Sequence, residues 1–552
     1  VYVVLFQART APGEADRTRD WWNGEPDRSF LSDRNRDGLT DARQSLLPGF
    51  STRDIVAGVS VALVLVPQSM AYADLAGLPA HYGLYAAALP PIAAAFFASS
   101  PYLQTGPVAL TSLLTLGALS ALATPGSQMY VALAALLALV VGVARIIVGL
   151  VKEGRISYLM SRPVLQGFTM GAALLILASQ LPGAFGVSPP AVGVIPKAWW
   201  TLSHPGDWEP ASVVLAVVTG VLILGGRKIH PLVPGVLLAT LIGVGYSVAT
   251  GYSGAIVGEI PAGLPPLPRD MPWSQLPLLL IPGGVIALVG FAEAASISRA
   301  FAVMDRRPWD PDREFISQGV ANVVAALSSG FPVGGSFGRS SLNQLAGARS
   351  RWSGAITGVA VLLFLPVAGI LSPLPRAVLS GIVIAAVVGL IRLPALARLW
   401  RLSKPQALNA WTTFALTLIL APRIDLAVVI GILLALGIHA WREMKVRCDS
   451  WREDSTFHLA PRGVLWFGSA PQMQRSFMRE LEQGHEVDRI VLHLGSLGRI
   501  DLSGAMMLKE FQEEMAAGDI AVEIAGVPYH ARRILRRTLG WDPEGAEEQS
   551  TG

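Results

Sequence analysis

The sequence predicts a polytopic α-helical membrane protein that continues into a smaller soluble α/β domain. Three observations support this fold class. Of the 552 residues, 52% are hydrophobic and 15% are charged, whereas a soluble domain has about 25% charged residues. Long apolar runs recur from about Ile55 to about Trp441. From Glu453 onward, short strand-like and amphipathic helical patterns alternate, as in a soluble α/β domain.

Composition and charge divide the chain and exclude several classes of protein. One cysteine excludes a disulfide framework, and a net charge of +4 is too small at this length to indicate a nucleic-acid partner. The N-terminal stretch is mostly polar, and its apolar run is too short to be the hydrophobic region of a signal peptide. We expect a flexible or artefactual extension over 1–45, a transmembrane domain over 46–447, a second domain over 448–543 and a disordered tail over 544–552.

The apolar region divides into about fourteen runs, which we interpret as membrane segments. A straight helix needs about 20 apolar residues to cross a bilayer, and the runs after Gly106 and Gly338 are shorter. We expect these two to be half-helices. The runs are 55–75, 83–98, 107–123, 128–151, 163–181, 211–225, 231–250, 277–298, 315–329, 337–347, 354–371, 376–391, 408–421 and 424–441.

Loop charges predict the orientation in the membrane. Loops that follow even-numbered segments hold most of the Lys and Arg residues, and the opposite loops hold only Lys197, Arg269, Arg376 and Arg423. Because positive loops stay on the cytoplasmic side, both termini are expected in the cytoplasm. We predict a multi-pass protein of the inner (plasma) membrane, with the lipid bilayer as its surroundings.

The two halves of the apolar region show an internal symmetry. The first segment carries PQSMAYA (67–73), and the third begins after QTGP (104–107). The eighth segment carries GFAEAAS (290–296), and the tenth begins in GGSFGRS (334–340). Short segments broken by Gly and Pro at matching places predict a midplane binding site between inverted repeats.

Motifs typical of enzymes and ATPases are not found. The sequence contains no Gly-Lys pair for a P-loop and no HExxH, and its histidines are not paired at metal-ligand spacing. No Gly-x-Ser-x-Gly elbow is expected on a strand–helix turn. We therefore expect a transporter or channel without a cofactor or metal, and not an enzyme.

The two half-helix starts predict a site for a small anion. They are expected at Val108–Ala109 and Phe337–Gly338, where free backbone N–H groups and positive dipole ends converge. Arg339 would add positive charge, because an intramembrane Arg usually faces the protein interior. The alternatives are that the glycines only permit tight helix crossing and that Arg339 extends to the membrane interface.

Three other polar residues are candidates for this site. Glu293 has no adjacent charge and could exchange a proton with the medium, or it could be a buried structural residue. Gln68 and Tyr72 lie one helical turn apart and could line the pocket, although Tyr72 could equally serve packing. Arg145 is expected near a cytoplasmic helix end and receives no role.

Four stretches resemble the SulP sulfate-permease family: 67–85, 105–112, 290–302 and 334–350. The resemblance implies a 7+7 inverted repeat with core and gate domains, an anion site between the third and tenth helices, and a homodimer. The family's site positions are matched by Gln68, Tyr72, Val108, Phe337, Gly338 and Arg339.

This sequence departs from the family pattern at two site positions. Many relatives have a serine at the position of Gly338, and some have an aromatic residue at that of Val108. At Gly338 only backbone groups could bind an anion. The resemblance therefore does not determine which anion this chain selects.

The second domain is predicted to be cytoplasmic and α/β. FHLAPRGVLWFG (457–468) suggests a hairpin with Pro-Arg-Gly as its turn. The sequence IDLSG (500–504) resembles the STAS domain, in whose soluble relatives the residue matching Ser503 is phosphorylated. We expect Ser503 to be the N-cap of the next helix, with a regulatory role as the alternative.

The leading functional hypothesis is a secondary active transporter of a small anion such as sulfate, bicarbonate or a short dicarboxylate. Proton symport by an elevator-like alternating-access mechanism is expected, with the proton as coupling ion. The alternatives are a passive anion channel, a voltage-responsive membrane motor, a nucleobase permease of the same architecture, and a receptor that signals through the STAS domain.

Overall fold

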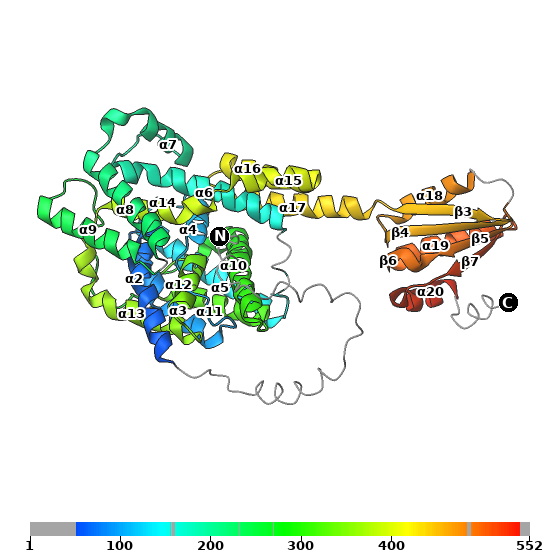
Figure 1. Cartoon of the computed structure of the whole chain (residues 1–552), viewed down its shortest axis with the longest axis horizontal. Helices are drawn as coiled ribbons and strands as arrows, with labels where there is room; N and C mark the ends of the chain where they lie inside the picture. The colour runs from blue at the N-terminus through cyan, green and yellow to red at the C-terminus, as the bar shows by residue number, and fades with distance from the viewer. Residues whose placement is uncertain are drawn as a thin grey trace, which may run out of the picture. The chain divides into compact units, whose positions relative to one another are not determined.

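The computed structural model describes residues 51–154, 156, 161–230, 232–268, 270–482 and 487–540 (Figure 1). The extension expected over 1–45 and the tail expected over 544–552 lie outside these residues. The described part contains a helical membrane region and, after it, an α/β domain, as the sequence predicts. Eight of the described helices are long and apolar enough to cross a membrane.

The expected segments correspond to α2–α6, α8–α14, α16 and α17. Two short helices, α7 and α15, were not expected, and each follows the fifth segment of its half. The first half contains α2 (Thr52–Leu75), α3 (His81–Phe97), α4 (Ala109–Leu119), α5 (Gln128–Leu150), α6 (Arg162–Phe185), α7 (Val194–Ser203), α8 (Pro210–Ile229) and α9 (Gly235–Thr250). The second half contains α10 (Leu276–Asp305), α11 (Pro311–Leu327), α12 (Phe337–Leu345), α13 (Trp352–Phe364), α14 (Arg376–Val387), α15 (Leu393–Leu402), α16 (Lys404–Ile419) and α17 (Ile424–Glu443).

The membrane helices form two groups that each take the same elements from both halves. The first four helices of each half pack together, with α5 on α11, α3 on α13 and α10 on α4. The later helices form the second group, with α16 on α6, α14 on α8 and α17 on α16. Small residues permit the close approaches: a Cβ on Gly142 would lie 2.7 Å from the backbone nitrogen of Val323.

A two-stranded crossing brings the halves together ahead of the half-helices. Strand β1 (Thr105–Gly106) pairs antiparallel with β2 (Gly334–Gly335). Its register sets Thr105 opposite Gly335 and Gly106 opposite Gly334. Because α4 begins three residues after β1 and α12 two residues after β2, the pairing places both helix starts at one point in the fold.

The α/β domain has a mixed sheet in the order β3-β4-β5-β7, with β6 paired to β4. Helices α18 and α19 pack on the sheet through Phe477 and Phe511, whose ring centroids lie 5.0 Å apart. The strands are β3 (Arg447–Glu453), β4 (Thr456–Leu465), β5 (Arg489–His493), β6 (Leu497–Ile500) and β7 (Ala521–Ala525), and the helices are α18 (Ala470–Glu482), α19 (Leu502–Ala516) and α20 (Arg532–Leu539).

The hairpin expected at Pro-Arg-Gly is wrong. Strand β4 runs through this sequence, and the hairpin is formed by β3 and β4 with its turn at Asp454, where φ is +52°. On its other side, β4 pairs with β5 up to Leu459 and with β6 from Gly463. Pro461 lies between these two ladders, where its missing N–H costs no parallel hydrogen bond.

The expectation that Ser503 caps α19 is also wrong. The N-cap is Asp501, whose carboxylate accepts a hydrogen bond from Gly504 N at 2.8 Å. Asp is at least as good an N-cap as Ser, and it occupies the extended position before the helix. Ser503 instead lies exposed in the first turn.

Candidate functional site

Both half-helices begin beside the β1–β2 crossing. In α4, the N-cap Val108 offers no side-chain acceptor, and the first intrahelical bond runs from Ser112 N to Val108 O over 3.0 Å. In α12, Ser336 Oγ accepts a hydrogen bond from Arg339 N at 3.5 Å. The other first-turn N–H groups have no intrahelical acceptor. Together with two positive dipole ends, they can stabilise an anion.

Arg339 in the first turn of α12 is 1% exposed. Its Nη1 donates to Gln68 Oε1 at 3.2 Å, and Gln68 Nε2 donates to Tyr72 Oη at 2.9 Å. A Cβ on Gly106 would lie 3.4 Å from Arg339 Nη2, so the guanidinium lies against β1. Arg339 Nε and Nη2 have no hydrogen-bond partner among the described residues. Buried donors without partners are costly, so this arrangement favours an anionic ligand.

Glu293 on α10 is a carboxylate near this site. It is partly exposed, and the described part of the chain offers it no ion pair or hydrogen bond. It interacts electrostatically with Arg339 and Tyr72. Protonation of Glu293 would therefore change the net charge around the half-helix starts.

The other predicted site residues lie at the two helix starts. Val108 is 5% exposed, and Ala109 next to it is partly buried. Phe337 is 45% exposed, and its ring stacks with that of Phe301 at a centroid distance of 6.4 Å. Apart from its own helix backbone and chain neighbours, no described residue has an atom within 4 Å of a Cβ built on Gly338, so this position faces open space.

Gln104 belongs to the crossing and was not among the site residues predicted from the sequence. It is 0% exposed, its backbone N–H donates to Ser340 Oγ at 2.9 Å, and its carbonyl accepts from Ser336 N at 3.0 Å. Both polar side-chain atoms of Gln104 lack a partner within the described residues. A polar residue directly before the Thr-Gly-Pro turn was the available signal.

Arg145 was also missed. It lies near the end of α5, as expected, but its side chain is 0% exposed, which the sequence did not predict. A single Arg within the otherwise apolar run 128–151 was a signal of the same kind as Arg339.

Residues 334–338 read GGSFG and join β2 to α12, so the expectation that no Gly-x-Ser-x-Gly turn joins a strand to a helix is wrong. The chemistry still differs from that of a nucleophile elbow. Ser336 caps α12, and in the described residues no histidine hydrogen-bonds to its hydroxyl. A serine nucleophile needs an adjacent base, so this turn supports a helix start instead.

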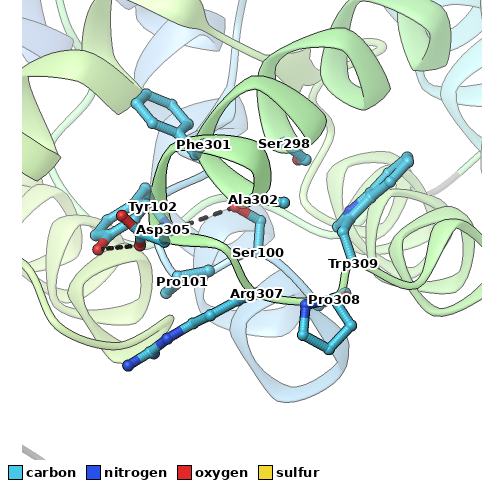
Figure 2. A pocket seen from close by; sticks show the side chains of 11 residues that line it. Ser100, Pro101, Tyr102, Ser298, Phe301, Ala302, Asp305, Arg307, Pro308 and Trp309 are labelled. Atoms are coloured by element: carbon cyan, nitrogen blue, oxygen red, sulfur yellow. Dashed lines mark hydrogen bonds between the residues drawn. The ribbon is translucent and has the colours of Figure 1, made fainter. Parts of the chain in front are cut away.

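Figure 2 shows a separate small cavity near the end of α10. Its volume of about 20 Å³ fits about one water molecule. Tyr102 Oη donates to Asp305 Oδ2 at 2.7 Å beside it, and Ser298 lines it with a hydroxyl that has no hydrogen-bond partner among the described residues. Its lining residues do not include those at the half-helix starts.

Paired half-helices, a strand crossing and two helix groups drawn from both halves define a membrane transporter built from inverted repeats. The chain belongs to the sulfate permease family. The model of that family matches residues 52–413, and the model of the STAS domain matches residues 452–539. The predicted family and fold class are therefore confirmed.

Relatives of the chain are transporters. It is 32% identical to sulfate transporter 4.1, chloroplastic, of Arabidopsis thaliana, over 86% of this chain and 74% of that protein. It is 30% identical to the probable sulfate transporter Rv1739c of Mycobacterium tuberculosis, over 90% of this chain and 92% of that protein. These relatives confirm that the protein is a transporter and not an enzyme.

Solved structures agree on the fold. The structure of SLC26A9 matches with a TM-score of 0.83 at 18% identity, over 92% of this chain and 91% of that chain. The transmembrane domain of the cyanobacterium bicarbonate transporter BicA matches with a TM-score of 0.60 at 25% identity, over 70% of this chain and 97% of that chain.

Proposed function

We propose that this protein is a secondary active transporter that couples uptake of a small oxyanion to protons through elevator-like alternating access. The substrate class is sulfate, bicarbonate or a short dicarboxylate. The observation that carries the proposal is the Arg339 guanidinium, which is buried at the start of α12 with two nitrogens that lack partners in the described residues. A small anion would satisfy these donors together with the first-turn N–H groups of α4 and α12.

The names of similar proteins support an oxyanion. They include sulfate transporters and a bicarbonate transporter. A nucleobase permease is disfavoured, because a neutral base would leave the buried Arg339 charge uncompensated. We also propose that the protein is a homodimer of the inner (plasma) membrane and that both of its termini lie in the cytoplasm.

Glu293 supports coupled transport over a passive channel or a motor. A negative Glu293 repels a bound anion, whereas a protonated Glu293 does not. Anion binding would therefore favour proton binding, and by thermodynamic linkage proton binding would favour the anion. This reciprocity is the basis of symport.

The test is uptake of labelled sulfate and bicarbonate into proteoliposomes, with and without an inward proton gradient. The gradient should stimulate uptake in the wild-type protein. Glu293→Gln should keep anion binding and lose the stimulation. Glu259→Gln, which changes an exposed carboxylate outside the helices, is the matched control and should behave like wild type.

Two results would contradict the proposal. Accumulation against a concentration gradient by Glu293→Gln when protons flow inward would show that the coupling group lies elsewhere. Wild-type protein that binds neither sulfate, bicarbonate nor a dicarboxylate would reject the oxyanion class.

A further inference from the structure

A second cation lies buried within the first helix group. Arg145 on α5 is 0% exposed. Its Nε donates to Ala287 O at 3.1 Å and its Nη2 to Ile286 O at 3.2 Å, both on α10. Its Nη1 donates to Val333 O at 3.0 Å, directly before β2. In the described part of the chain, no carboxylate forms an ion pair with Arg145, so its charge is solvated only by backbone carbonyl groups.

These contacts place Arg145 directly behind the half-helix starts. A Cβ on Gly290 would lie 2.6 Å from Arg145 Nη2 and 3.1 Å from Thr111 Cγ2, so both side chains surround this glycine. Thr111 is in the first turn of α4, and its hydroxyl donates to Pro332 O at 3.1 Å. The guanidinium therefore contacts the backbone that leads into β2 and lies beside the first turn of α4.

The contacts give Arg145 two separable effects. Its hydrogen bonds hold the segment before β2 against α5 and α10. Asn322 supports the same segment, since its Nδ2 donates to Val333 O and its Oδ1 accepts from Val333 N, each at 3.0 Å. The positive charge is a second effect, because carbonyl dipoles solvate a cation without cancelling its net charge.

We propose that Arg145 is a positioning residue whose charge sets the preference of the anion site for divalent over monovalent anions. The inference rests on the proposed anion site, which it deepens by assigning a determinant of substrate charge. Arg145 does not contact the anion. The first turn of α4 and the segment before β2 lie between them, and the electric field of Arg145 acts on the anion across these segments. Because the Coulomb energy is proportional to the charge of the anion, a divalent anion gains twice the stabilisation of a monovalent one.

The test is the full-length variant Arg145→Gln, which removes the charge and keeps one amide donor. Half-saturating concentrations of sulfate and of bicarbonate are measured in proteoliposomes at a pH where sulfate is divalent and bicarbonate monovalent. If the affinity for bicarbonate falls about tenfold, that for sulfate should fall about a hundredfold, since the lost energy doubles.

Gly290→Ala is the matched control. Its Cβ shifts the Arg145 guanidinium but keeps a positive side chain at this position, so the ratio of the two affinities should change much less than in Arg145→Gln. Arg145→Lys also keeps a cation near the same carbonyls and should retain the wild-type ratio of the two affinities. This variant tests the proposal on its own if Arg145→Gln does not fold.

Equal losses for both anions in Arg145→Gln would overturn the proposal and leave Arg145 a structural residue. So would a folded Arg145→Lys that shows the altered ratio, or a folded Arg145→Gln with unchanged affinities. A wild-type protein that binds no anion would instead reject the proposed function, so the two failures are distinguishable.

Discussion

The two half-helices occupy equivalent places in the repeat, but they differ in chemistry. Helix α4 buries three uncharged polar residues, Thr111, Ser112 and Thr115, and its N-cap Val108 contributes no side-chain hydrogen bond. Helix α12 has a serine N-cap and buries three polar residues, Arg339, Ser340 and Asn343. The shared position explains the two converging dipoles, and the difference is that, of the two described half-helices, α12 carries a charged residue and α4 carries none.

The second repeat also holds the first in place. Ser340 Oγ accepts from Gln104 N, and Ser336 N donates to Gln104 O, so both ends of this contact come from the start of α12. Asn343 Nδ2 donates to Tyr102 O at 3.2 Å, which extends the contact along the segment before β1. The polar residues of α12 therefore connect the two repeats, in addition to the anion-binding role proposed for Arg339.

The largest effect is expected from removing the charge that distinguishes the two half-helices. Arg339→Gln should weaken anion binding by roughly 10- to 150-fold, because hydrogen bonds to charged groups contribute about 1.5–3 kcal/mol. Binding is measured by competition against labelled sulfate, with Arg398→Gln on the exposed face of α15 as control. Folded Arg339→Gln with wild-type affinity would show that backbone dipoles alone form the site.

A smaller effect is expected from altering the crossing that both half-helices share. A Cβ at Gly335 would lie 2.7 Å from Leu103 Cδ1 and 3.1 Å from Ala294 Cβ, whereas a Cβ at Gly334 meets its nearest neighbour, Val108 Cγ2, at 3.3 Å. Gly335→Ala should destabilise the protein by about 1–3 kcal/mol through overpacking. Gly334→Ala should cost less.

Thermal unfolding of the two purified variants tests this order. If Gly334→Ala is the more destabilised of the pair, the close packing of β2 against α10 does not determine the stability of the crossing. Transport rates of the two variants should follow the same order, because the crossing positions both helix starts.

The smallest effect is expected at Gly338, which faces open space at the start of α12. Gly338→Ser places a hydroxyl there without a steric clash, and one additional hydrogen bond of about 0.5–1.5 kcal/mol should raise anion affinity by roughly 2- to 12-fold. Gly338→Ala adds the same Cβ without a donor and is the control. Equal affinities of the Ser and Ala variants would mean that the anion does not reach this position.

Several features could be predicted from the sequence because their signals are local. Apolar runs, a charge pattern in the loops and Gly/Pro-broken segments at matching places indicate membrane helices, their repeat and the two half-helices. Arg339 could be predicted as a site residue because a charged side chain within an apolar membrane segment is energetically costly and usually has a functional role. The hydrophobic pattern missed α7 and α15, whose short amphipathic sequences resemble loops at this scale.

What the sequence by itself determined is therefore the order and type of the membrane elements and the presence of a charged half-helix. Only the tertiary structure decided which polar groups meet. Thr105 pairs with Gly335, and Arg145 reaches Val333, across long stretches of chain. Such contacts depend on packing between helices, and no local periodicity encodes them. For the same reason, the hairpin turn lies at Asp454 and not at the predicted Pro-Arg-Gly. The position of a turn depends on which neighbouring strands complete the hydrogen-bond ladder.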